Sequence, residues 1–296
     1  MNIKQIENIL TEGGVDPKIE LNEAKIEAKM LVKHFLGLSD VDLVLNEEFE
    51  ESAILLEKAK LRSEKRIPIQ HIIGEASFMG ENFIVNENVL IPRDETEILV
   101  RKAVEIVKSK KQKAKSSKNT ICHLPFAICL KVLDIGTGSG CIACMIAKLT
   151  EAQVLGVDIS TKALQIALDN SSRLNLFNKA IFRKSDIFSN IKNDEKFDII
   201  VSNPPYIPQK EKEKLQIEVK FEPEKALFAS DENGIEFYDK IISRVNNFLI
   251  DGGYLIFELG QGQAEEVRKL MLKAGFKDIG IENDLAGIER IIWSKR

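Results

Sequence analysis

One short run of the chain, Asn203-Pro204-Pro205-Tyr206, combines hydrogen-bond acceptors, a stiff backbone and an aromatic ring. The prolines hold the backbone extended, so the side-chain oxygen of Asn203 and the carbonyl of Pro204 can point at one spot. Two acceptors there would bind both protons of an NH2 group and fix its plane, while Tyr206 offers a planar group a ring to stack on. We therefore predict that Asn203, Pro204 and Tyr206 are catalytic and that the whole run, with Pro205, binds the substrate.

A planar NH2 group is a poor nucleophile because its lone pair is delocalised, and no strong base can remove its proton first at neutral pH. Positioning, hydrogen-bond polarisation and exclusion of water must then lower the barrier. Methyl transfer suits such a site, because the sulfonium of S-adenosylmethionine supplies the electrophile without a metal or a covalent nucleophile. The run thus predicts an enzyme that methylates an amide or amine nitrogen.

A glycine-rich loop lies upstream, in the sequence Asp134-Ile135-Gly136-Thr137-Gly138-Ser139-Gly140. Such a turn between a strand and a helix lets a ligand approach the backbone closely. Its spacing, G-x-G-x-G, differs from the G-x-G-x-x-G of dinucleotide-binding proteins. Asp158 ends the next predicted strand and can accept hydrogen bonds from both ribose hydroxyls, and Asp186 follows the third strand, where it can meet the adenine amino group. These residues predict a site for an adenosyl cofactor.

Composition narrows the class of protein. The 296 residues fit two domains, or one core with a cap, and the formal net charge of -4 argues against a nucleic-acid-binding protein. No apolar run reaches the ~20 residues of a membrane span, and the start of the chain lacks the features of a signal peptide, so we expect a cytoplasmic protein. Cys141 and Cys144 lie in an apolar helical stretch and the histidines are scattered, so we predict no metal site.

The elements that would position these residues fall into three segments. Residues 1–67 are predicted to form an all-helical domain, with helices from Ile3 to before Gly13, from about Asn22 to Gly37, and over 48–65. Residues 68–92 hold short apolar runs such as Ile72-Ile73, broken by glycines and asparagines, and are predicted to be a β-hairpin connector.

Residues 93–296 are predicted to form the catalytic domain. It begins with a helix over 94–107 and a lysine-rich loop over 108–118, while residues 119–130 show no interpretable pattern. Strands and helices then alternate, which predicts an α/β fold with a mostly parallel sheet covered by helices on both faces. The strands are expected near 131–135, 154–158, 180–183, 197–202, 254–258, 277–282 and 288–293.

Several motifs together resemble those of the bacterial release-factor glutamine N5-methyltransferases, over nearly the whole chain. Residues 67–74, IPIQHIIG, resemble that family's connector, and residues 89–97, VLIPRDETE, resemble its "VLIPRPETE" signature, which abuts the cofactor. Residues 134–140 and 203–206 match its cofactor and substrate motifs, and Phe221-Glu222-Pro223 with Ala226-Leu227 resembles its EP-x-x-AL segment. Asp94 departs from the signature proline, Ile187 replaces a frequent aromatic, and the lysine-rich stretch is longer than usual.

The resemblance implies a class I methyltransferase with a seven-stranded, Rossmann-like sheet. It implies that the cofactor contacts are Gly136, Thr137, Gly138, Ser139, Gly140, Asp158, Asp186, Ile187 and Asn203. It also implies that Asn203 to Tyr206 hold the glutamine amide of the Gly-Gly-Gln motif in peptide chain release factors, whose methylation tunes translation termination. The helical domain would then be the docking surface for these factors, and S-adenosylhomocysteine would be the product.

Two alternatives remain at this point. An adenine-N6 DNA or RNA methyltransferase uses the same four-residue run, because adenine also presents an NH2 group on a planar ring; such an enzyme must flip its base and grip phosphates. A non-catalytic protein that binds the cofactor or a partner is the other alternative, although the intact Asn203 and glycine loop argue against it.

Overall fold

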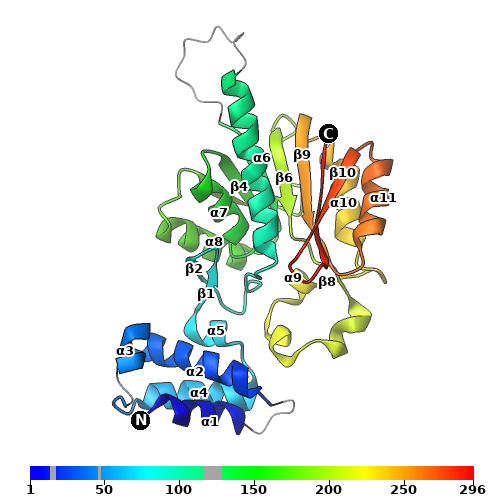
Figure 1. Ribbon diagram of the computed structural model, residues 1–296. Helices are drawn as coiled ribbons and strands as arrows, with labels where there is room; N and C mark the ends of the chain where they lie inside the picture. The colour runs from blue at the N-terminus through cyan, green and yellow to red at the C-terminus, as the bar shows by residue number, and fades with distance from the viewer. Residues whose placement is uncertain (14–17, 46–47, 117–128) are drawn as a thin grey trace. The chain divides into compact units, whose positions relative to one another are not determined.

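The computed structural model describes residues 1–13, 18–45, 48–116 and 129–296 (Figure 1). Its contacts divide the chain into two compact units, of which the first comprises Met1–Glu75 with Leu215–Phe221, and the second Ala76–Lys214 with Glu222–Arg296. This division differs from the predicted one, which placed the boundaries at residues 67 and 92. The first unit also includes a short segment that lies, in sequence, within the expected catalytic domain.

The first unit is a helical bundle around an apolar core that includes Ile6, Leu31 and Leu55. Its helices are α1 (Ile3–Thr11), α2 (Leu21–Leu36), α3 (Asp40–Leu45), α4 (Ala53–Lys65) and α5 (Ile69–Ile73). The helix predicted over 48–65 is too long, because the Ser52 side chain accepts the amide of Leu55 and starts α4 at Ala53. Helix α3 was not predicted.

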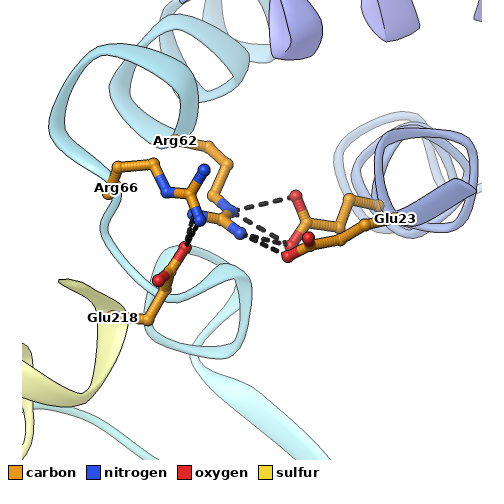
Figure 2. A network of polar contacts seen from close by, with 5 residues as sticks. Glu23, Arg62, Arg66 and Glu218 are labelled. Carbon is orange, nitrogen blue, oxygen red and sulfur yellow. Dashed lines mark hydrogen bonds and ion pairs between the residues drawn. The ribbon is translucent and has the colours of Figure 1, made fainter. Parts of the chain in front are cut away.

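A buried ion-pair network ties the returning segment into this unit (Figure 2). Arg62 is 1% exposed and donates to Glu27 at 2.9–3.0 Å, to Glu23 at 2.9 Å and to Glu218 at 2.8 Å. Glu218, in the 3-10 helix η2 (Ile217–Phe221), also pairs with Arg66. Because a buried guanidinium is costly to leave unpaired, these carboxylates hold η2 against α2 and α4.

The expected connector contains a hairpin, but it also contains a helix. Strands β1 (Glu75–Phe78) and β2 (Glu81–Ile84) form a two-stranded sheet. The interpretation of Ile72-Ile73 as part of a β-hairpin was wrong, because these residues lie in α5, which Gly74 ends in a left-handed conformation. The side chain of Asn170 fixes β2 to the second unit's interior, because it exchanges two hydrogen bonds with the backbone of Ile84 at 2.7 and 3.0 Å.

The second unit is built on the predicted seven-stranded sheet, in the order β10-β11-β9-β6-β3-β4-β5. Strand β11 runs antiparallel to both of its neighbours, and the remaining pairs are parallel. The α/β fold class is therefore confirmed. The strands are β3 (Lys131–Ile135), β4 (Gln153–Asp158), β5 (Ala180–Lys184), β6 (Phe197–Ser202), β9 (Leu249–Glu258), β10 (Lys277–Asn283) and β11 (Glu289–Lys295).

Helices cover both faces of this sheet (Figure 1). Alternate residues of β3 show the division, since Val132 packs in one core cluster with α6 and α7, and Leu133 in another with α10 and α11. The helices are α6 (Thr96–Ser116), α7 (Cys141–Leu149), α8 (Thr161–Arg173), α10 (Glu236–Val245) and α11 (Ala264–Lys273). Cys141 and Cys144 are buried in α7, as expected.

The lysine-rich stretch was wrongly predicted as a loop over 108–116, where α6 continues to Ser116. Lysine is a good helix former, so an amphipathic helix can extend through such a run. Residues 117–118 of that prediction, and 119–128 of the uninterpreted stretch, lie outside the described residues. Within the described parts of the chain, no helix is long and apolar enough to cross a membrane.

Between β6 and α10 the chain forms short elements. They are β7 (Ile207–Pro208), η1 (Gln209–Lys214), η2, α9 (Glu224–Leu227) and β8 (Phe228–Ala229), and β7 pairs with β8 in parallel. The chain therefore leaves the expected substrate motif at Tyr206, contributes η2 to the first unit, and returns to the second unit at Glu222.

Candidate active site

The glycine loop is a tight turn at the end of β3. The amides of Gly136 and Thr137 both donate to the carbonyl of Val157, at 2.8 and 3.0 Å, and the amide of Gly140 donates back to the carbonyl of Thr137 at 2.8 Å. Gly136 has a φ of +75°, a conformation that strains most other residues. A Cβ placed on it would lie 3.9 Å from the carbonyl oxygen of Asn203, so the loop backbone runs beside the Asn-Pro-Pro-Tyr run.

Asp158 joins the loop to the end of β4. Its carboxylate accepts the amide of Gly138 at 3.0 Å and the amide of Ser160 at 2.8 Å. Burial raises the pKa of this carboxyl group, and these backbone hydrogen bonds oppose the rise. The carboxylate thus both shapes the loop and lines the adjoining cavity, where it can accept hydrogen bonds from a bound polyol.

A cavity of about 380 Å³ lies at the carboxyl ends of these strands, entirely within the second unit. Its lining includes most of the predicted site residues: Gly136, Gly138, Asp158, Asp186, Ile187, Asn203, Pro204 and Pro205. Ligands of open α/β sheets bind at this edge. The cavity therefore brings the predicted cofactor residues and the predicted substrate run to one place.

Three predicted cofactor residues do not line this cavity. Thr137 is 3% exposed and donates to Asp134 Oδ2 at 2.6 Å, while the carbonyl of buried Ser139 accepts from Asn170 Nδ2 at 2.9 Å. A Cβ on Gly140 would meet the Cβ of Ala167 at 2.9 Å, so this glycine allows α7 and α8 to pack closely. These residues shape the loop from behind, which leaves its backbone for the cavity.

Tyr206 also lies apart from the main cavity. It lines a second one of about 360 Å³, together with Gly260 and Gln263. The Gln263 side chain is a hub there, because its Nε2 donates to the carbonyl of Tyr206 at 2.9 Å and to that of Asn233 at 2.9 Å, while its Oε1 accepts the amide of Gly260 at 3.1 Å. Burial raises the pKa of the Tyr206 phenol. Gln263 thus anchors the end of the run, a role without a local sequence signal.

Two buried carboxyl groups support the site. Asp134 is 0% exposed and Glu258, the last residue of β9, is 2% exposed. Burial raises the pKa of each to about 7, and hydrogen bonds from Thr137 and Thr96, respectively, oppose the rise. No sequence pattern predicts a role for Glu258 or for the side chain of Thr96.

A third carboxylate, Glu222, fixes the segment that precedes α6. It is 4% exposed, accepts the amide of Ile91 at 3.0 Å and pairs with Arg93. Val89 and Leu90, just upstream, line the cavity. Residues 89–97 and 221–227 both resemble motifs of the family, so the sequence predicts that each segment matters. Their contact, across 131 positions of sequence, appears only in the fold.

Comparisons with known proteins concern the family and the fold. Residues 129–284 match the family described as "Methyltransferase domain", and residues 4–74 match the "PrmC N-terminal domain". A release factor glutamine methyltransferase of Flavobacterium psychrophilum is 39% identical over 92% of this chain and 92% of its own length. The predicted class I methyltransferase fold is thereby confirmed.

Other relatives are longer than this chain. A release factor glutamine methyltransferase of Fusobacterium nucleatum is 37% identical over 83% of this chain, which spans 65% of its length, and the chain spans 54% of the length of bifunctional methyltransferases of Rickettsia species. Among solved structures, the hMettl16 catalytic domain matches with a TM-score of 0.55 at 14% identity, over 86% of this chain and 82% of that one, and so shares the fold. On the family match and the Flavobacterium relative together, the chain belongs to the release factor glutamine methyltransferase family.

Proposed function

We propose that this protein transfers a methyl group from S-adenosylmethionine to the side-chain amide nitrogen, N5, of the glutamine in the Gly-Gly-Gln motif of release factors, and so tunes translation termination. The observation that carries the proposal is the shared cavity. Asn203, Pro204 and Pro205 line it together with Gly136 and Asp158, so a planar amide and an adenosyl cofactor could meet there.

The residues fit this cofactor. Cβ atoms added to Gly136 and Gly138 would come no closer than 3.9 Å and 4.0 Å to their nearest described neighbours, so the loop presents bare backbone to the cavity. The Asp158 carboxylate can accept hydrogen bonds from both ribose hydroxyls, and Asp186 and Ile187 line the same cavity and would take the adenine. When bound, the cofactor supplies an electrophilic methyl group on a sulfonium.

The protein's own part in the reaction is positioning. The Oδ1 atom of Asn203 and the carbonyl oxygen of Pro204 each accept a hydrogen bond from one N–H of the substrate amide. These two bonds fix the plane of the amide and turn its lone pair towards the methyl group. These acceptors stabilise the positive charge that grows on the nitrogen, and they hold its protons until one leaves during or after transfer. Tyr206, anchored by Gln263, keeps the run in place.

The decisive experiment is mass spectrometry of release-factor peptides after incubation with enzyme and S-adenosylmethionine. We expect a mass gain of one methylene on a single glutamine. Asn203→Ala should abolish this gain with cofactor binding nearly unchanged, whereas Asn283→Ala, on the distant strand β10, should retain it. Methyl transfer to DNA or RNA alone would instead favour the adenine-N6 alternative, and full activity of Asn203→Ala would remove the residue from the mechanism.

We also propose that the helical unit docks the release factor. The observation behind this is α3, which exposes three apolar side chains: Val41 (64%), Val44 (83%) and Leu45 (74%). Val44→Asp should raise KM for a whole release factor and leave the turnover of a short Gly-Gly-Gln peptide unchanged. An unchanged KM for the whole factor would exclude this face as the docking surface.

A further inference from the structure

A chain of two hydrogen bonds runs from the predicted substrate run into the protein interior. Asn203 Nδ2 donates to Thr96 Oγ1 at 3.4 Å, and Thr96 Oγ1 donates to Glu258 Oε2 at 2.6 Å. Thr96, the first residue of α6, is 3% exposed, and Glu258 is 2% exposed. Both partners are therefore shielded from water, and neither lines the main cavity, so they reach a substrate only through Asn203.

The direction of these hydrogen bonds matters because the oxygen and nitrogen ends of a carboxamide are similar in shape. Its oxygen accepts hydrogen bonds and its nitrogen donates them, so a half-turn about the last side-chain bond would present donors where an NH2 substrate needs an acceptor. A threonine hydroxyl has one proton. When that proton is committed to the carboxylate of Glu258, the hydroxyl oxygen can only accept, and only Asn203 Nδ2 can satisfy it.

We propose that Glu258 and Thr96 are positioning residues that hold the Asn203 carboxamide with its oxygen towards the substrate amide. This inference rests on the proposed function of Asn203 as the acceptor for that amide. The Glu258 carboxylate takes the proton of the Thr96 hydroxyl in a hydrogen bond, and the hydroxyl oxygen can then only accept from Asn203. Neither residue touches the reacting atoms.

Ionisation of Glu258 should therefore control turnover. A protonated Glu258 can donate to Thr96 Oγ1, which frees the threonine proton to turn towards Asn203 and stabilises the reversed carboxamide. Burial raises the pKa of Glu258, so this protonation falls near neutral pH. The other titratable or charged groups that face Glu258 are Arg93 and Glu95 before α6, Tyr206 after β6, Tyr238 of α10, Cys141 of α7 and Arg290 of β11.

Kinetic measurements on the protein test the two hydrogen bonds that link Asn203, Thr96 and Glu258. Thr96→Val, which keeps the shape but removes the hydroxyl, should lower kcat by about 10- to 100-fold. Thr96→Ser should restore most of that loss. Thr150→Val, the matched control, removes a buried hydroxyl that donates to the carbonyl of Ile146 and accepts the amide of Ala152, and should leave kcat unchanged. The affinity for S-adenosylmethionine, measured by calorimetry, should stay the same in all three variants.

The pH profile provides a readout that a purely structural role would not move. The wild type should lose kcat as the pH falls through the pKa of Glu258, whereas Glu258→Gln should show about tenfold lower kcat at high pH and no such acid limb. In the Thr96→Val background, Glu258→Gln should have no further effect on kcat, because the transmitting hydroxyl is already gone. Additive losses, or an acid limb that persists in Glu258→Gln, would overturn the proposal.

A measurement without substrate separates this proposal from the proposed function. The side-chain amide signals of Asn203 in a 1H–15N spectrum, assigned by their loss in Asn203→Ala, should shift with pH between about pH 5.5 and 8.5 in the wild type. They should stay fixed in Glu258→Gln. If no release factor is methylated but the signals shift with pH in the wild type alone, the proposed function is wrong and the proposed role of Glu258 and Thr96 is supported. If methylation occurs but the signals are equally pH-dependent in the wild type and in Glu258→Gln, the proposed role of Glu258 and Thr96 is wrong and the proposed function is unaffected.

Discussion

The two buried acids of the second unit, Asp134 and Glu258, should make the protein more stable as the pH falls from 8 towards about 5.5. Burial raises their pKa values to about 7 from ordinary values of 3.8 and 4.5. A raised pKa means that the folded state holds a proton that the unfolded chain has already released. The resulting stability is fully present below the unfolded pKa and is lost as the pH rises through the folded pKa.

The size of the effect follows from the pKa values. Between pH 5.5 and the folded pKa of about 7, each acid contributes about 1.5 pH units of linked titration, which is ~2 kcal/mol. The two together give ~4 kcal/mol in the free energy of unfolding between pH 5.5 and pH 8. Urea unfolding of the cofactor-free protein at these two pH values, followed by fluorescence and circular dichroism, measures this difference directly.

Single variants show how much of the pH dependence of the free energy of unfolding comes from each acid. Glu258→Gln and Asp134→Asn should each remove ~2 kcal/mol of this pH dependence. Glu195→Gln is the matched control, because the Arg183 hydrogen bond lowers the pKa of Glu195 to about 2. A lowered pKa contributes stability that is lost only as the pH falls below the unfolded value, outside this window. Wild-type stability that is flat or falls on acidification, or an unchanged slope in Glu258→Gln, would refute the reasoning.

Three further predictions concern the site and its support. Asp158→Asn should raise the Kd for S-adenosylmethionine by about 10- to 100-fold in calorimetry, because a carboxylate accepts the ribose hydroxyls more strongly than an amide. Gly234→Ala should lower kcat, since its Cβ would lie 2.0 Å from the carbonyl oxygen of Tyr206; Gly262→Ala, with a similar φ of +79° but no described atom within 4 Å, isolates the backbone strain. Arg62→Met should destabilise the helical unit by about 3–5 kcal/mol in thermal unfolding, because it leaves buried Glu27 unpaired.

The sequence predicts well what local patterns determine. Apolar runs placed the seven strands, and the glycine spacing placed the turn whose backbone faces the cavity. Of the predicted site residues, Asp158, Asp186 and Asn203 meet in one cavity because each lies at, or within two residues after, the carboxyl end of a strand in the parallel part of the sheet. Chain order and strand order are thus enough to bring these residues together.

What sequence patterns missed depends on contacts between distant segments. Thr96 and Glu258 are 162 positions apart, and Gln263 and Tyr206 are 57 apart, so no spacing rule connects them. Polar residues at the ends of elements are also common as caps, which gives Thr96 no distinctive signal. The lysine-rich end of α6 has a charge run that is typical of a solvated loop, although lysine also has a high helix propensity, so the run does not distinguish a loop from a helix.

Glu258 links the stability of the fold to its proposed chemistry. At pH 8 its raised pKa corresponds to about 3 kcal/mol of lost stability, because a buried carboxylate is then ionised in a site that favours the neutral acid. The ionised form is also the one that commits the Thr96 proton and orients Asn203. Glu258→Gln should therefore be more stable than the wild type at pH 8 and yet less active there. A residue that served only the fold would lose stability and activity together when replaced, so the opposite signs of these two changes distinguish positioning from packing.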